Sequence, residues 1–301
     1  MGPDGAEEGR RGLAVASMTS AATTAAAATS TGTNDTHGAK RIAAAFARAR
    51  ADGRAALIPY VVAGYPDAET SVEIALAAAD AGADLLEVGL PYRDPLADGA
   101  TLQRASGAAL KAGASLEGSL RLIELIGAAR PDLPLVPMSY ANQVIGGGDG
   151  EAVARRLAGA GAAGVIVADL TPDEGEPFEA VARDVGLAVV YLVAPTTPPA
   201  RRAMIAARSG GFLYCVSLVG VTGARTALPS SVGDLIRDVR AVSPVPVAVG
   251  FGVSKPAHVR AIAKSGADGV IVASALVDAL GDAGRDIQAL AHLIGQLRAA
   301  T

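Results

Sequence analysis

The sequence predicts an α/β protein of the (β/α)8, or TIM-barrel, class, with residues 40–301 forming one barrel domain. Eight short apolar segments follow one another here, and a stretch with helical periodicity succeeds each of them. The apolar segments are continuous rather than alternating, which is typical of parallel strands buried on both faces. The 262 residues also match the usual size of such a barrel. An open doubly wound sheet is the alternative, and near-equal units without a break in composition make it less favoured.

Expected strands and helices alternate along the whole of this domain. Strands are expected at residues 56–67 (with a closing turn), 85–90, 134–142, 164–170, 187–195, 211–217, 245–252 and 268–274. Helices are expected at residues 69–84, 101–129, 150–162, 177–186, 198–210, 231–242, 255–267 and from residue 275 onward. An extra N-terminal helix at residues 40–54 precedes the first strand.

Residues 1–39 are expected to be a disordered tail. Ala, Thr, Ser and Gly dominate there without apolar periodicity, so the tail cannot bury enough surface to fold. Arg10 and Arg11 followed by GLAVAS resemble a twin-arginine export signal only faintly, because the apolar part is short and soon polar. Met18 could equally be the true start of the chain.

Composition argues against several classes of function. A net charge of −4 gives no sign of a nucleic-acid surface, and no strongly apolar run is long enough to span a membrane. The one cysteine, Cys215, excludes an intrachain disulfide and fits a reducing cytoplasm. Because His37, His258 and His292 lack the spacing of metal ligands, we expect no metal site.

Three similar junctions between a helix and the next strand support the barrel. Gly82, Gly161 and Gly266 each precede an alanine and the start of an apolar run. Each glycine is expected to end its helix in a left-handed cap, which fixes the direction of the strand that follows. The functional residues are therefore expected at the opposite, carboxyl ends of the strands.

The stretch LLEVGLPYRDPLADGATLQ, residues 85–103, is the strongest candidate for a site. Glu87 interrupts an apolar strand, where burial of an unpaired carboxylate is costly. A loop rich in Gly and Pro follows and carries Asp94 and Asp98. A solvated acidic loop after an ordinary strand is the plainer alternative.

Small residues at the ends of the last three expected strands predict a phosphate site. They comprise Gly220-Val221-Thr222-Gly223, Gly250-Phe251-Gly252 and Ala273-Ser274. Backbone N–H groups at such positions can approach an anion, and the helix that Ser274 opens favours negative charge. Ordinary tight turns are the alternative reading of these glycines.

Other strand ends supply the remaining candidates for substrate binding. Tyr60, Tyr140 and Tyr214 could line an apolar slot, and Asp169 ends the expected fourth strand. A carboxyl group in such a slot has its pKa raised and can move protons near neutral pH. Asp169 could instead hold backbone N–H groups at the strand end.

Five motifs together resemble the tryptophan synthase α subunit family over about residues 40–280. They are EVGLPYRDPLADGATLQ, MSYAN, GVIVADL, SLVGVTGARTALP and VGFGVS. The resemblance implies a lyase that cleaves indole-3-glycerol phosphate to indole and glyceraldehyde 3-phosphate in the biosynthesis of tryptophan. It also implies a β-subunit partner in an α2β2 complex, with pyridoxal phosphate bound only by that partner and no cofactor in this chain.

The resemblance also assigns roles by position. Glu87 matches the general acid/base, and Asp98 matches the aspartate that holds the indole N–H. Arg93 and Asp94 fall in the loop that faces the partner. The phosphate binders correspond to Gly223, Gly252, Ala273 and Ser274, and the pocket residue to Tyr214.

Three positions depart from the family pattern. Arg93 stands where serine is common and could pair with Asp94, Ala100 replaces a common proline, and Ala273 replaces a common glycine. A methyl group at position 273 is tolerable if its φ is negative. Two alternatives stay open: a stand-alone indole-releasing lyase, for which Arg93 is the hint, and a non-catalytic phosphate-binding regulatory barrel, against which Glu87 and Asp98 argue.

Overall fold

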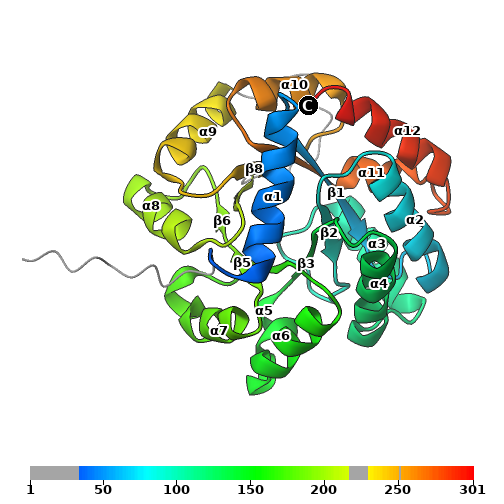
Figure 1. Cartoon of the computed structure of the whole chain (residues 1–301). Helices are drawn as coiled ribbons and strands as arrows, with labels where there is room; N and C mark the ends of the chain where they lie inside the picture. Colours follow the sequence, from blue (N-terminus) through cyan, green and yellow to red (C-terminus); the bar gives the residue numbers. More distant parts are fainter. Residues whose placement is uncertain (1–33, 217–229, 251) are drawn as a thin grey trace, which may run out of the picture.

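The structure, a computed structural model, describes residues 34–216, 230–250 and 252–301, and its strands form a barrel (Figure 1). The paired strands of these residues are all parallel, in the order β5-β4-β3-β2-β1-β9-β8-β7-β6. They are β1 (Ala56–Val62), β2 (Leu86–Gly89), β3 (Leu135–Ser139), β4 (Gly164–Val167), β5 (Ala188–Val190), β6 (Leu192–Val193), β7 (Leu213–Val216), β8 (Val247–Gly250) and β9 (Gly269–Val272). The predicted barrel class is confirmed.

The expected fifth strand, residues 187–195, is divided into β5 and β6 at Tyr191. The Tyr191 N–H group bonds the hydroxyl oxygen of Ser209 at 3.0 Å, outside the strand ladder. Its phenol donates to the buried carboxylate of Glu179 at 2.5 Å. Because β5 pairs with β4 and β6 pairs with β7, this bent segment closes the ring.

Helices surround the strands on the outside of the ring, except for α1, which lies across one end of it (Figure 1). They are α1 (His37–Ala51), α2 (Ala68–Asp80), α3 (Ala100–Lys111), α4 (Leu116–Ala129), α5 (Ala141–Val144), α6 (Gly150–Gly159), α7 (Pro172–Asp184), α8 (Pro199–Arg208), α9 (Ser230–Val242), α10 (Pro256–Lys264), α11 (Ser274–Ala279) and α12 (Ile287–Arg298), with a 3-10 helix at Gly146–Gly148. No helix among the described residues combines the length and apolarity needed to cross a membrane.

Two helices differ from expectation. The segment expected as one helix at 101–129 is two, because Gly113 takes a φ of 93° and the Ser115 hydroxyl caps α4 through the Gly118 N–H at 3.2 Å. The extra N-terminal helix begins at His37, where the Thr36 hydroxyl accepts the Ala39 N–H at 3.1 Å. The predicted tail at residues 1–39 is therefore wrong at its C-terminal end, since residues 37–39 belong to α1, and residues 1–33 lie outside the described residues.

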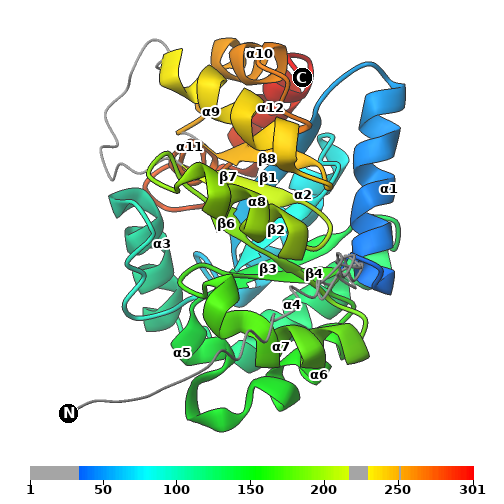
Figure 2. The same ribbon diagram turned by 90° about the vertical axis from the view of Figure 1, so that its left-hand side faces the viewer.

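The α1 helix covers the N-terminal end of the barrel. Its Ile42 and Phe46 are buried in the interior cluster, together with inward-facing strand residues such as Ile58 and Leu85. Gly38 allows the closest approach, since a Cβ there would lie 1.7 Å from the Ala163 carbonyl oxygen. Figure 2 shows α1 at the end of the molecule opposite α3, so the carboxyl ends of the strands open on the far side.

The repeated junctions strengthen the same end of the barrel. Gly82, Gly161 and Gly266 have φ values of 113°, 94° and 92°, as expected of left-handed caps. Asp84 and Asp268, which follow two of them, accept the N–H groups of the neighbouring strands β1 and β8 at 2.8 Å each. These junctions therefore tie adjacent strands together at the end away from the predicted site.

Candidate active site

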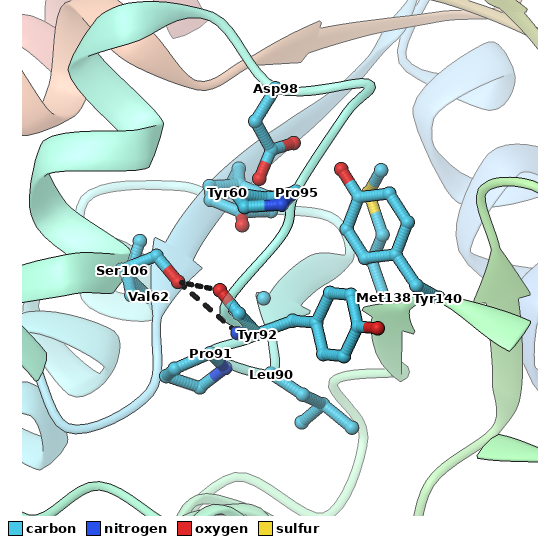
Figure 3. A pocket seen from close by; sticks show the side chains of 11 residues that line it. Tyr60, Val62, Leu90, Pro91, Tyr92, Pro95, Asp98, Ser106, Met138 and Tyr140 are labelled. Carbon is cyan, nitrogen blue, oxygen red and sulfur yellow. Dashed lines mark hydrogen bonds between the residues drawn. The ribbon is translucent and has the colours of Figure 1, made fainter. Parts of the chain in front are cut away.

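A hollow opens at the carboxyl ends of β1, β2 and β3 (Figure 3). Its walls are formed by Tyr60, Val62, Gly89, Leu90, Pro91, Tyr92, Pro95, Asp98, Ser106, Met138 and Tyr140. The candidates Tyr60, Asp98 and Tyr140 are thus brought together from a strand, a loop and a second strand end. Most of the lining residues are aromatic or apolar, and the Asp98 carboxyl group and the Ser106 hydroxyl group add polar surface, a mixture that suits a flat, largely apolar substrate.

Glu87 lies on β2 below this hollow. It shares the inward face of the strand with Leu85 and Gly89, because alternate residues of a strand point to the same side. The residue is 1% exposed, and neither carboxyl oxygen has a hydrogen-bond partner among the described residues. Burial, followed by the charge of Asp98, raises the pKa of Glu87 to about 8. Glu87 is therefore protonated at neutral pH and able to donate its proton.

Asp98 has a lower pKa than Glu87 although both carboxyl groups are desolvated. Burial raises the pKa of Asp98 to about 6, and a hydrogen bond with Tyr140 opposes that rise. In Figure 3 the Asp98 carboxyl group lies between the Tyr60 side chain and the Tyr140 hydroxyl group. At neutral pH the site therefore places an ionised carboxylate near a protonated carboxyl group.

The loop between β2 and α3, residues 90–99, is fastened to β3 and α3. The Tyr140 hydroxyl accepts the Ala97 N–H at 3.1 Å, and its ring stacks on Tyr92 with centroids 5.2 Å apart. The Ser106 hydroxyl accepts the Tyr92 N–H at 3.2 Å, and Asn142 donates to the Tyr92 hydroxyl at 2.9 Å. These contacts fix the loop that carries Asp98.

Tyr60 and Tyr214 face the barrel interior at the level of the acids. Burial is the main cause that raises the pKa of each phenol, and the charges of Glu87 and Asp98 add to it. Gly89 and Gly250 accommodate the two rings, since a Cβ would lie 1.8 Å from the Tyr60 hydroxyl and 2.8 Å from the Tyr214 hydroxyl. Tyr60 lines the hollow, whereas Tyr214 lies deeper, in the interior cluster.

Three of the four expected phosphate-binding residues are described. Gly252 follows β8 with a φ of 63°, Ala273 caps α11, and Ser274 is the first residue of that helix. The strands β8 and β9 are adjacent, so these positions lie at neighbouring strand ends. The methyl group of Ala273 is tolerated because its φ is −123°. Gly223, together with residues 220–222, lies outside the described residues.

The remaining candidates lie outside the hollow. Arg93 and Asp94 are exposed on the 90–99 loop. The suggested ion pair between Arg93 and Asp94 is not among the ion pairs of the described residues. Leu96 beside them is 92% exposed. Asp169 accepts the Ala141 N–H at 2.6 Å and so caps the short α5 helix. That contact matches the structural alternative, although Asp169 remains exposed near the end of β4.

Sequence reasoning missed three residues that form the hollow. Tyr92 stands in the motif that contains Glu87 and Asp98, but no role was predicted for it. Ser106 and Met138 were also missed, and they come from α3 and β3. Only Tyr92 carried a local signal, as an aromatic residue directly after the Gly89-Leu90-Pro91 turn.

The arrangement suits proton transfer to a bound apolar substrate. The protonated Glu87 and the ionised Asp98 face one desolvated space. General acid–base chemistry needs such a pair, one group that donates a proton and one that carries negative charge. No group of three His, Cys, Asp or Glu side chains within the described ranges is placed to hold a metal ion. The predicted proton-moving role of Glu87 has the burial and protonation state that it requires.

Comparisons with known proteins agree with these features. The family model for "Tryptophan synthase alpha chain" matches residues 46–300. A tryptophan synthase alpha chain from Roseiflexus castenholzii is 47% identical over 240 residues, covering 80% of this chain and 91% of the relative. One from Gloeobacter violaceus is 45% identical over 265 residues, covering 87% and 95%.

Solved structures show the same likeness. A structure of Mycobacterium tuberculosis tryptophan synthase superposes with a TM-score of 0.80 at 42% identity, covering 86% of this chain and 97% of that one. A mutant tryptophan synthase alpha-subunit from Pyrococcus furiosus gives a TM-score of 0.75 at 36% identity, covering 80% and 97%.

Proposed function

Because the chain belongs to the tryptophan synthase alpha chain family, whose members are lyases that cleave indole-3-glycerol phosphate in tryptophan biosynthesis, we propose that Glu87 and Asp98 carry out this cleavage here. The observation that carries the proposal is the buried, unpartnered carboxyl group of Glu87 with its pKa raised to about 8, close to the ionisable Asp98.

The reaction is a retro-aldol cleavage that begins with protonation of the indole ring. The protonated Glu87 carboxyl group donates its proton to C3 of the indole, which leaves positive charge on the ring. The Asp98 carboxylate accepts the indole N–H and stabilises that charge. Both roles require the protonation states that burial gives these two acids near pH 7.

Breakage of the carbon–carbon bond completes the reaction. The ionised Glu87 carboxylate now accepts the proton of the side-chain hydroxyl group next to C3. The electron pair of that O–H bond forms the aldehyde of glyceraldehyde 3-phosphate, and the pair of the broken C–C bond returns to the ring and releases neutral indole. One residue thus serves as acid and then as base, and no net proton is taken up.

The walls of the hollow hold the indole ring in this proposal. Tyr60 and Tyr140 supply aromatic surface, and Tyr214 lies deeper, in the interior cluster. Asp169 is a weaker candidate for substrate binding because its carboxylate already caps α5. The phosphate group is assigned to Gly252, Ala273 and Ser274, which offer backbone N–H groups at neighbouring strand ends. Gly223 completes that assignment by resemblance alone.

The partner is proposed to be a tryptophan synthase β subunit in an α2β2 complex. Support comes from the solved relatives, whose titles name tryptophan synthase. Arg93 and Asp94, exposed with Leu96 on the 90–99 loop, are the proposed contact. Alpha chains of this family need no cofactor themselves, and pyridoxal phosphate is assigned to the β subunit. A cytoplasmic location fits a biosynthetic lyase.

The proposal is tested by indole release from indole-3-glycerol phosphate, measured with and without a β subunit. We expect release by the chain alone and a strong increase when the partner is added. Release that the partner does not change would favour the stand-alone lyase, and complete absence of release in both conditions would contradict the proposed reaction.

A further inference from the structure

Tyr60 and Glu87 are register partners on the adjacent strands β1 and β2. Both side chains point into the barrel, because Ile58 and Leu85, two residues earlier on each strand, belong to the interior cluster. The Tyr60 ring packs with Ala105 and other apolar residues of α3 and α11, which hold its orientation. The residue is 7% exposed and lines the hollow.

Gly89 determines where the Tyr60 hydroxyl group lies. A Cβ at position 89 would lie 1.8 Å from the hydroxyl oxygen and 2.3 Å from the carbon that bears it. The phenol therefore occupies the space that any other residue at 89 would fill. Since Gly89 is two residues beyond Glu87, the hydroxyl group lies on the same inward face of β2 as the catalytic carboxyl group.

Both polar groups lack partners within the part of the chain that the structure describes. The two oxygens of Glu87 are buried and make no hydrogen bond, and the hydrogen bonds of the described residues do not include the Tyr60 hydroxyl group, which lines the hollow. Buried phenols and carboxyl groups normally find partners, because an unmade hydrogen bond in a desolvated site is costly. Two unpartnered groups at one strand register indicate a bond that forms during the reaction rather than at rest.

We propose that Tyr60 is a positioning residue for Glu87, whose hydroxyl group donates a hydrogen bond to the Glu87 carboxylate once that residue has given its proton to the substrate. This inference rests on the proposed function of Glu87. A donor of this kind stabilises the ionised carboxylate and directs its free oxygen toward the substrate hydroxyl group, from which the next proton must come.

Other groups facing Glu87 are less suited to this task. Asp98 in the 90–99 loop is itself a carboxylate and repels the charge. Tyr140 at the end of β3 faces Asp98, and its hydroxyl oxygen already accepts the Ala97 N–H. Tyr214 on β7 is a second possible donor, because the charge of Glu87 acts on its phenol, but its hydroxyl group lies against Gly250 of β8. Tyr60 is the donor that shares the strand register of Glu87.

The test compares pH profiles of kcat and KM for indole release by the full chain and three Tyr→Phe variants. For Tyr60→Phe we expect kcat to fall about tenfold with KM little changed, because the bond forms only during turnover. The loss of activity at high pH, which follows the ionisation of Glu87, should move to higher pH, because loss of a donor to the ionised carboxylate raises the pKa of Glu87. The melting temperature should stay at the wild-type value, because the resting hydroxyl group has no partner to lose.

Tyr191→Phe is the matched control. It removes a buried phenol that is hydrogen-bonded to Glu179, far from the hollow, so it should lower the melting temperature without moving the pH profile. The inference is overturned if Tyr60→Phe keeps the wild-type kcat and the wild-type position of the high-pH limb, or if only its KM rises. It is also overturned if Tyr214→Phe moves the high-pH limb and Tyr60→Phe does not. Loss of activity in Glu87→Gln is measured in parallel, so failure of this inference is separated from failure of the proposed function.

Discussion

The phenol of Tyr140, at the end of β3, faces the carboxyl group of Asp98, in the loop that follows β2, and lowers the pKa of that acid. The same hydroxyl oxygen accepts the N–H of Ala97 at 3.1 Å. One side chain thus holds both the backbone of the loop and the acid that it carries. The position and the charge of Asp98 consequently depend on a residue from another strand.

The first prediction concerns Tyr140→Phe. Loss of the phenol hydroxyl group that favours the ionised form should raise the pKa of Asp98 above its value of about 6. The acid limb of kcat/KM should move to higher pH, and kcat/KM at pH 7 should fall roughly tenfold. Tyr191→Phe serves again as the control for loss of a buried phenol. An acid limb at its wild-type position would show that Tyr140 does not govern Asp98.

The second prediction is the pH dependence of the wild-type chain. Asp98 must be ionised to stabilise the charged ring, so activity should be lost as the pH falls through about 6. Glu87 must be protonated to start the reaction, so activity should also be lost as the pH rises through about 8. Measurement of kcat/KM against pH should give a bell with its maximum near neutrality. A profile that stays level well beyond both values would contradict the assigned protonation states.

The third prediction concerns Ala100→Pro. Ala100 is the first residue of α3, where proline is well accommodated, and the preceding Gly99 is extended with φ −73° and ψ 166°. Proline there restricts the unfolded chain, so the free energy of unfolding should rise by about 0.4–1 kcal/mol in urea titrations. Proline at the buried Ala105, within the same helix, should instead destabilise by about 3 kcal/mol. A loss of stability in Ala100→Pro would mean that the first turn of α3 differs from this description.

The fourth prediction is a stability gain from Glu87→Gln that depends on pH. The pKa of Glu87 in the folded chain, about 8, exceeds its ordinary value of 4.5, so the folded state binds this proton more tightly than the unfolded state. Its cost to folding is absent below the unfolded pKa, grows between the two values and is complete above about pH 8. At pH 7 it reaches about 3 kcal/mol.

Glutamine cannot ionise, so the melting temperature of Glu87→Gln relative to wild type should rise from pH 5 to pH 8 (about the two ends of this range). The same scan on Glu151→Gln, an exposed acid on α6, provides the control and should show no such rise. If the melting temperatures of Glu87→Gln and wild type differed by the same amount at both pH values, Glu87 would not be held protonated by burial.

Much of the fold could be predicted because its signals are local. Continuous apolar runs marked the strands, and the glycines at 82, 161 and 266 marked helix ends that the structure confirms. Gly113 and Ser115 were local signals too, a helix stop and a helix cap, and the prediction of one helix over 101–129 overlooked them. The division of the fifth strand at Tyr191 had no local signal, because its cause is contacts with Glu179 and Ser209, distant in sequence.

The site shows the same difference between local and distant signals. Glu87 could be found because an acid within an apolar strand is unusual, and Asp98 because its motif resembles a known family. Ser106 could not, and the local signal at Tyr92 gave no role, because the roles of both residues depend on stacking and a hydrogen bond across the 90–99 loop. The structural contact of Asp169 with Ala141 likewise joins residues 28 positions apart.

The central claim is that Glu87 moves the protons in the cleavage of indole-3-glycerol phosphate. Its most direct test is the rate of indole release by Glu87→Gln, which keeps the shape of the side chain and removes its proton. A folded variant with kcat reduced by about 10²-fold or more is the expected result. Wild-type turnover by that variant would contradict the account.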